Sequence, residues 1–260
     1  MKTTLIELHQ AAQYLSAAGI SFVNHQADDS HTNLGWDTKN KRLLTHYLSS
    51  KKYQLALSIE SGNLEWLRNG RSEDSIKLSD STHLDNLNWI KSQAKMRGLK
   101  DYKFEFHYEL PYPQLDKDHV FSFDPEAIGL IANSWDIGYE AFEKLLVDWK
   151  FDSSIRVWSH HFDLGVYVQL DKAATLFIGG GLAIPDSLVD DLYYYVSGWK
   201  NGVAVKTKSF GTLNIGEWRS DWNGATLPAS NMNVNLVNLF LKITLEVFLE
   251  NNLAEIANRK

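Results

Sequence analysis

The residues best suited to chemistry lie in the segment from Trp158 to Gln169. In a regular strand, His161 and Asp163 would share one face, with their side chains about 6–7 Å apart at their roots. A carboxylate at that distance can orient an imidazole, fix its tautomer and raise its basicity. Such a pair serves general acid–base catalysis or polar ligand binding. We therefore predict His161 and Asp163 as the catalytic pair; the alternative is an exposed pair on a solvated sheet face.

The same strand would place Trp158 and His160 on its opposite, apolar face. A histidine among apolar neighbours is more often a core residue satisfied by one backbone partner. A bulge at His160 and His161 would instead bring both rings to one side. We keep Trp158 and His160 as ligand-binding candidates.

A second polar cluster contains His25, Asp28, Asp29 and His31. Imidazole and carboxylate groups at close spacing suit zinc or another divalent ion. The spacing matches no known metal motif, and polar loops often collect such residues. We therefore expect no bound metal and no cofactor. His31 and the nearby Asn33 are predicted to bind ligand.

Two further regions supply candidates for ligand binding. His107 and Glu109 alternate with apolar residues, which predicts the polar face of a strand. Arg219 and Trp222 lie in a tryptophan-rich segment that suits a pocket for a small organic molecule. The alternatives are a solvated strand face for the first pair and core packing for most of the aromatic residues.

Common catalytic signatures are missing from the chain. It has no P-loop, no G-x-S-x-G nucleophile elbow and no H-E-x-x-H zinc motif. The glycines at 179–181 lack the lysine of a phosphate-binding loop, so a bulge or the close approach of another backbone explains them better.

Composition narrows the function classes. The 260 residues carry a formal charge of −6 and no cysteine, which excludes disulfides and thiolate sites. A basic footprint for nucleic acid is not visible, and no apolar run approaches a membrane span. Glu7 and His9 interrupt the first turns, unlike a secretory signal. We expect a cytoplasmic protein that binds neither nucleic acid nor membrane.

Periodicity predicts the elements that must position these residues. Apolar residues at helical spacing indicate helices over 5–15, with Gly19 as a stop, over 84–96, from Asp124 to Trp149, and after a cap at Ser230 or Asn231. Alternation and turn residues predict a hairpin over 53–66 and strands over 104–110, 156–170, 174–184, 192–199 and 217–227. Strands in runs predict an α+β fold with mainly antiparallel sheets and packed helices.

An internal duplication is suggested by two similar blocks. Ser30-His31-Thr32-Asn33-Leu34-Gly35-Trp36 echoes Ser159-His160-His161-Phe162-Asp163-Leu164-Gly165-Val166 with one extra residue. We therefore predict a single globular domain over 1–260 with two similar helix-plus-sheet halves, about 1–115 and 120–260. The alternative is two unrelated strands that both use glycine.

Four blocks of the sequence resemble an uncharacterised family of bacterial proteins along nearly the whole chain. The blocks are His31-Thr32-Asn33-Leu34-Gly35-Trp36, His107-Tyr108-Glu109-Leu110-Pro111, Trp158-Ser159-His160-His161-Phe162-Asp163 and Leu227-Pro228-Ala229-Ser230. The family usually has proline where this chain has Ser159, and a Ser-Pro-Gly-Asp turn where it has Ala183-Ile184-Pro185-Asp186. The resemblance implies no reaction.

Three functions remain open at this point. The first is binding of a small molecule by a polar His/Asp/Asn site in an aromatic-lined pocket, with or without catalysis. The second is a metal-dependent hydrolase that uses His25, Asp28, His31 and the block from His160 to Asp163. The third is a non-catalytic interaction protein in which the histidines are incidental.

Overall fold

Four α-helices and two antiparallel sheets make up the part of the chain that the computed structural model describes, residues 1–257. The helices are α1 (Lys2–Phe22), α2 (His83–Met96), α3 (Pro125–Trp149) and α4 (Val234–Ala257). The strands follow one another in runs, so the predicted α+β class is confirmed. Within the described residues, no helix is both long enough and apolar enough to cross a membrane.

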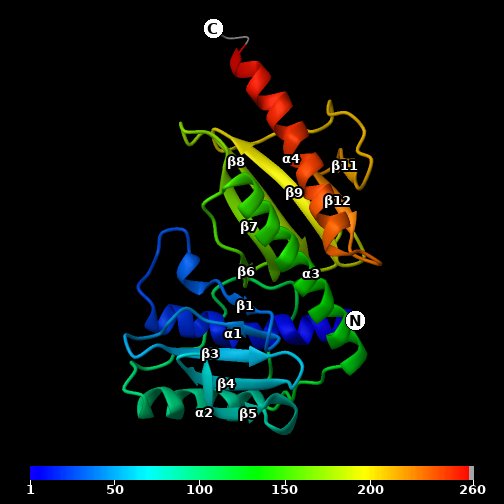
Figure 1. Cartoon of the computed structure of the whole chain (residues 1–260). Coiled ribbons are helices and arrows are strands. Elements are labelled where there is room, and N and C mark those ends of the chain that lie inside the picture. Colours follow the sequence, from blue (N-terminus) through cyan, green and yellow to red (C-terminus); the bar gives the residue numbers. More distant parts are fainter. Residues whose placement is uncertain (258–260) are drawn as a thin grey trace. The chain divides into compact units, whose positions relative to one another are not determined.

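The chain divides into two compact units. The first unit contains residues 1–133 and 156–162, and the second contains residues 134–155 and 163–260. Each unit has its own sheet and its own helical cover (Figure 1). The two units are described separately below.

The sheet of the first unit has five strands in sequential antiparallel order. They are β1 (Gly35–Asp37), β2 (Arg42–Leu44), β3 (Tyr53–Ser58), β4 (Asn63–Arg68) and β5 (Arg71–Lys77). β3 and β4 confirm the predicted hairpin, with Leu57 opposite Leu64 and a left-handed Gly62 (φ +67°) in its turn. β1, β2 and β5 were not predicted, and the largely exposed, charged β5 forms an edge.

The predicted first helix is confirmed, but it does not stop at Gly19. α1 continues to Phe22, so Gly19 lies inside the helix. Another segment of the chain passes close to the helix at this glycine. A Cβ at Gly19 would lie 2.5 Å from the carbonyl oxygen of His31, in the 3₁₀ turn η1 (Ser30–Thr32). Glycine is therefore required at this position by contact and not by helix termination.

The predicted strand over 104–110 is wrong. This segment has no regular structure, and its aromatic rings dock against helices instead. Phe104 packs against Tyr14 of α1 and His83 of α2, with ring centroids 5.3 and 5.2 Å apart. The alternation of apolar and polar residues reflects this docking, while Pro111 and Pro113 each lack the backbone N–H of a ladder.

The sheet of the second unit is antiparallel, and β6 (Arg156–Trp158), which precedes it in the chain, belongs to the first unit. The strands in the second unit are β7 (Asp163–Gln169), β8 (Leu176–Ala183), β9 (Tyr193–Lys200), β10 (Val203–Ala204), β11 (Glu217–Arg219) and β12 (Gly224–Pro228). β11, β12, β9, β8 and β7 are neighbours in that order, and β10 pairs with β9. The predicted strands over 174–184, 192–199 and 217–227 are confirmed, the last as a hairpin.

Aromatic side chains approach the glycines of β8, whereas the sequence predicted a bulge or the close approach of another backbone. A Cβ at Gly181 would lie 2.6 Å from the ring of Tyr195, on β9. Gly180 faces the Phe142 ring of α3, 3.6 Å from where its Cβ would be. These glycines leave room for the neighbouring side chains, and they lie within a strand rather than in a phosphate-binding loop.

The helix starts follow local hydrogen bonding. Pro125 opens α3 as predicted, and Asp124 accepts a hydrogen bond from the backbone nitrogen of Glu126 at 3.2 Å. α4 begins later than predicted, because Asn233 rather than Ser230 or Asn231 accepts hydrogen bonds from two backbone nitrogens of its first turn, at 3.0 and 3.1 Å.

The predicted continuous strand over 156–170 is wrong. It is two strands, β6 and β7, separated by a turn at residues 159–162. The carbonyl of Trp158 accepts hydrogen bonds from the backbone nitrogens of His161 and Phe162 at 3.2 and 2.7 Å. The first predicted block likewise places a turn, η1, before a strand, β1. The duplication of the two halves stays a prediction.

Candidate functional site

The turn at 159–162 is fixed to α1 by three buried polar residues. His9, Gln13 and Ser16 recur at helical spacing, so they share one face of α1. His9 Nε2 and Gln13 Nε2 lie 2.8 and 2.9 Å from the carbonyl oxygen of Ser159, and Ser16 Oγ lies 3.1 Å from Ser159 Oγ. This polar tether holds the neighbouring His160 and His161 on a rigid element of the first unit.

His9 is held neutral by its surroundings. A carbonyl only accepts hydrogen bonds, so His9 Nε2 donates to Ser159 and Nδ1 accepts from the Tyr112 hydroxyl. Burial lowers the pKa of His9 to about 4, against an opposing hydrogen bond to Ser159. The ring also stacks on Phe162, with centroids 4.9 Å apart. His9 is therefore a structural residue at neutral pH.

Backbone strain marks the end of this turn. Phe162 has φ +56° and is fully buried. A bulky side chain in the left-handed region is uncommon and costs about 1–2 kcal/mol. Burial of the ring against His9 offsets that cost, so the turn conformation depends on packing within the first unit.

Aromatic rings link this turn to the 107–108 segment. The rings of His160 and His161 have centroids 4.2 Å apart, and Tyr108 lies 4.8 Å from His160. His107 follows at 4.5 Å from Tyr108. Burial, together with His161, lowers the pKa of His160 to about 4. His160 Nδ1 is buried without a hydrogen-bond partner among the described residues.

The loop before β1 supplies the other half of the cluster. His25, Asp29 and His31 each offer one ligand atom, and these atoms all lie within 4.8 Å of one another. His31 is buried and Asp29 has φ +56°. His107 Nε2 lies 3.4 Å from Asp29 Oδ2 and so joins the two halves. We call His25, Asp29, His31, His107, Tyr108, His160 and His161 the histidine cluster.

A small cavity adjoins the cluster at Tyr108. It encloses about 150 Å³ and is lined by Phe106, Tyr108, Glu109, Leu110, Tyr112 and Gln114. The Tyr108 hydroxyl lies 3.3 Å from Thr32 Oγ1, beside His31. Tyr112 reaches the same cavity from its bond with His9. The cluster therefore has both polar groups and an aromatic-walled space.

The structure brings together several of the predicted site residues and leaves others apart. His31, His107, His160 and His161 join in the cluster, and Glu109 lines its cavity. The Trp158 ring contacts His160, with ring centroids 6.0 Å apart. Asn33 is buried, and its Oδ1 accepts a hydrogen bond from His46 at 2.9 Å.

The remaining predicted residues lie in the second unit. Asp163 is buried and accepts a hydrogen bond from the Tyr195 hydroxyl. Burial, and then Asp163, raises the pKa of Tyr195 well above its ordinary value. Trp222 packs against Tyr195, with ring centroids 5.7 Å apart. Arg219 is bound by Glu217 and Asp221 at 2.9 Å each.

The geometric basis of the predicted His161–Asp163 pair is therefore wrong. The pair required both residues on one strand, whereas His161 lies in the turn and Asp163 begins β7. His161 is exposed and belongs to the first unit, and Asp163 is buried and belongs to the second. The left-handed backbone conformation of the single residue Phe162 changes the direction of the side chains that follow it.

Sequence reasoning missed the residues that support the cluster. His9, Gln13 and Ser16 left a signal, namely polar residues repeating on one side of an otherwise apolar helix. Tyr108 and Tyr112 left none, because their segment has no regular structure. Their positions depend on contacts with α1 and with the 159–162 turn.

Comparison of the chain with family models, curated proteins and solved structures gave no significant match. The resemblance of the four sequence blocks to a bacterial family thus stays a prediction.

Proposed function

We propose that the first unit binds a small polar molecule at the histidine cluster, anchored by a divalent cation that His25, Asp29 and His31 hold. The observation that carries this proposal is the distance of at most 4.8 Å between their ligand atoms. Two imidazoles and one carboxylate are a donor set that suits zinc. This arrangement leads us to revise the expectation from sequence that no metal binds.

Small side-chain movements would complete the coordination. Ligand atoms around tetrahedral zinc lie about 3.3 Å apart, given metal–ligand bonds of about 2.0–2.1 Å. His31 Nδ1 accepts a weak hydrogen bond from the backbone nitrogen of Gln26 at 3.4 Å, which coordination at Nδ1 would replace. His107, 3.4 Å from Asp29, is placed to orient the carboxylate.

Three protein ligands leave one position of a tetrahedral ion open, and this favours binding of a further molecule. Tyr108 and the buried Nδ1 of His160 provide polar groups nearby, within the same unit. The adjoining 150 Å³ cavity suits a compact molecule with few atoms beyond its polar group. Hydrolysis is the second candidate function, because the open position also suits a water molecule.

Calorimetric titration of the metal-free full chain with zinc chloride tests the cation site. We expect one ion per chain, with affinity reduced at least about 100-fold in His31→Ala and similarly in Asp29→Asn, because removal of groups that merely support a ligand already costs 10–100-fold. His119→Gln is the matched control. His119 pairs with Glu7 at 3.1 Å in the same unit and should leave zinc binding unchanged.

Two results would reject the cation site: zinc binding no tighter than millimolar in the wild type, or equal loss in the control.

Cobalt substitution then tests the open position, because azide binding to cobalt changes its visible absorption bands. Unchanged bands would reject the small-molecule proposal. Hydrolysis of p-nitrophenyl acetate, lost in His31→Ala and kept in His119→Gln, would favour the hydrolase.

A further inference from the structure

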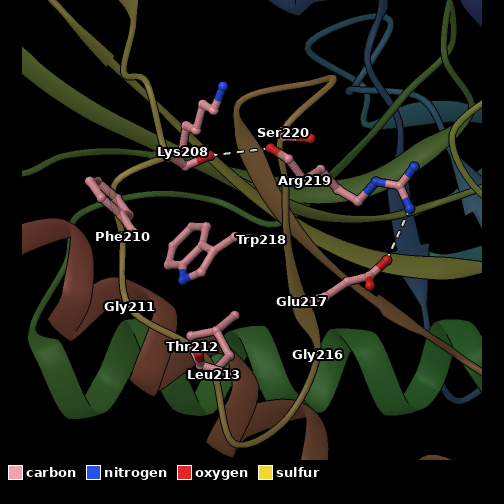
Figure 2. A pocket seen from close by; sticks show the side chains of 11 residues that line it. Lys208, Phe210, Gly211, Thr212, Leu213, Gly216, Glu217, Trp218, Arg219 and Ser220 are labelled. Carbon is pink, nitrogen blue, oxygen red and sulfur yellow. Dashed lines mark hydrogen bonds and ion pairs between the residues drawn. The ribbon is translucent and has the colours of Figure 1, made fainter.

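A second pocket lies wholly within the second unit, between the 207–213 segment and β11 (Figure 2). It encloses about 320 Å³, within the range of pockets that hold small organic molecules. Its lining is formed by Thr207, Lys208, Phe210, Gly211, Thr212, Leu213, Gly216, Glu217, Trp218, Arg219 and Ser220. None of these residues belongs to the histidine cluster.

The wall of this pocket is aromatic and braced by a helix. The rings of Phe210 and Trp218 meet edge to face, with centroids 4.9 Å apart and planes at 89°. Phe248 of α4 supports both rings, at 5.4 and 5.8 Å. In Figure 2 the indole of Trp218 occupies the opening between the 208–213 segment and β11. A planar apolar group would find a matching surface here.

The two cationic side chains at the pocket rim, Arg219 and Lys208, differ in whether carboxylates already pair with them. The guanidinium of Arg219 is held by Glu217, as Figure 2 shows, and also by Asp221, so two carboxylates more than offset its charge. Lys208 is exposed, and no ion pair of it appears among the described residues. Lys208 is therefore the cation of the pocket lining that remains to attract an anion.

Trp218 adds a polar group to the apolar wall. Its Nε1 is buried and has no hydrogen-bond partner among the described residues. A buried donor without a partner is unfavourable, and an incoming acceptor would relieve it. A ligand with an acceptor atom fits this demand better than a hydrocarbon does.

We propose that this pocket binds a small planar aromatic carboxylate. The ring lies against Trp218 and Phe210, and the carboxylate faces Lys208. The proposal is independent of the cation site, since the residues of the two sites belong to different units.

Titration with 2-naphthoate, and with the uncharged 2-naphthamide, tests this proposal in the full chain. The readout is the ¹⁵N–¹H signal of the Trp218 indole, assigned by its disappearance in Trp218→Phe. We expect this signal to shift with naphthoate, and naphthoate to bind about threefold more tightly than naphthamide, the effect of one exposed ion pair.

Lys208→Ala should abolish the preference for naphthoate, while Lys206→Ala, an exposed lysine outside this pocket, should keep it. Phe210→Ala should weaken both probes at least tenfold, with an unchanged spectrum elsewhere showing that the fold is kept. An indole signal that does not move, or equal effects of the two lysine variants, would overturn the proposal.

Discussion

The two candidate sites are built in opposite ways. The histidine cluster rests on buried polar bonds between α1 and the 159–162 turn, and burial lowers the pKa of the supporting His9 and of its member His160 to about 4. The pocket beside β11 rests on aromatic packing, and its charged groups lie at an exposed rim. Rigid polar support favours defined distances, as metal coordination needs, whereas aromatic packing favours tolerance of shape.

The chain segments that support the two sites also differ, since one is a helix and the other has no regular structure. His9, Gln13 and Ser16 come from the middle of a long buried helix. The 207–213 segment has no regular structure, and Thr207 and Leu213 are its buried residues. A local change should therefore affect the first site through stability and the second through the shape of one loop.

Acid should affect the histidine cluster most strongly of all. The pKa of His9 is about 4 in the folded chain and about 6.5 when unfolded, so the unfolded state binds more protons between these values. The stability that neutral His9 contributes is present above pH 6.5 and is lost as the pH falls towards 4. We expect a loss of about 3 kcal/mol over that window from His9.

Urea denaturation at pH 7 and at pH 5 measures this effect. His9→Gln keeps a donor for the Ser159 carbonyl but cannot titrate, so about 2 kcal/mol of the wild-type difference between the two pH values should vanish. An unchanged pH dependence in His9→Gln would show that His9 is not the acid-sensitive support, and the contrast between the sites would weaken.

A glycine in the second site should have the next largest effect. Gly216 has φ +74°, and a Cβ there would lie 2.6 Å from the Phe240 ring and 2.7 Å from the carbonyl oxygen of Thr226. Gly216→Ala should reduce stability by about 2 kcal/mol, because it combines backbone strain with overpacking. It should also weaken naphthoate binding.

Gly211→Ala is the matched control for this change. A Cβ at Gly211 has no heavy atom within 4 Å among the described residues, so stability should change by less than about 0.5 kcal/mol. Thermal denaturation of both variants provides the comparison. Equal melting temperatures would show that the loop adapts more freely than its contacts indicate.

The smallest effect should come from Ser16→Ala. This change removes the hydroxyl 3.1 Å from Ser159 Oγ, which is buried, and should cost about 1 kcal/mol. Ser79→Ala removes an exposed hydroxyl bonded to Asp80 and should be nearly neutral. The urea midpoint of Ser16→Ala should therefore be lower than that of Ser79→Ala. Equal midpoints would mean that Ser16 is not part of the tether.

The sequence predicted what local patterns determine. The hairpin over 53–66 followed from alternation and a Ser-Gly-Asn turn, and the start of α3 followed from its cap and proline. His25, Asp29 and His31 could be grouped because they are neighbours in the chain. Local hydrogen bonds and short spacing fix all of these features.

Long-range contacts explain the failures. The break at 159–162 depends on side chains of α1 that are about 150 residues distant in sequence, and nothing within the segment indicates it. Tyr108 joins His107 to His160, and it lies in a segment whose alternation wrongly predicted a strand. Alternation of apolar and polar residues can arise from aromatic rings that dock against helices or from pairing of strands, and the two cases look alike in sequence.

The close contact at Gly19 should constrain the sequences of homologous chains. Alanine is favoured over glycine inside a helix by about 1 kcal/mol, so a helical glycine tends to be replaced over time. Here the His31 carbonyl blocks any larger residue. We expect homologous chains to keep glycine at this point wherever they keep the η1 turn, and to regain alanine where the turn has been lost. This one position would then serve as a marker in alignments for the presence of the first site.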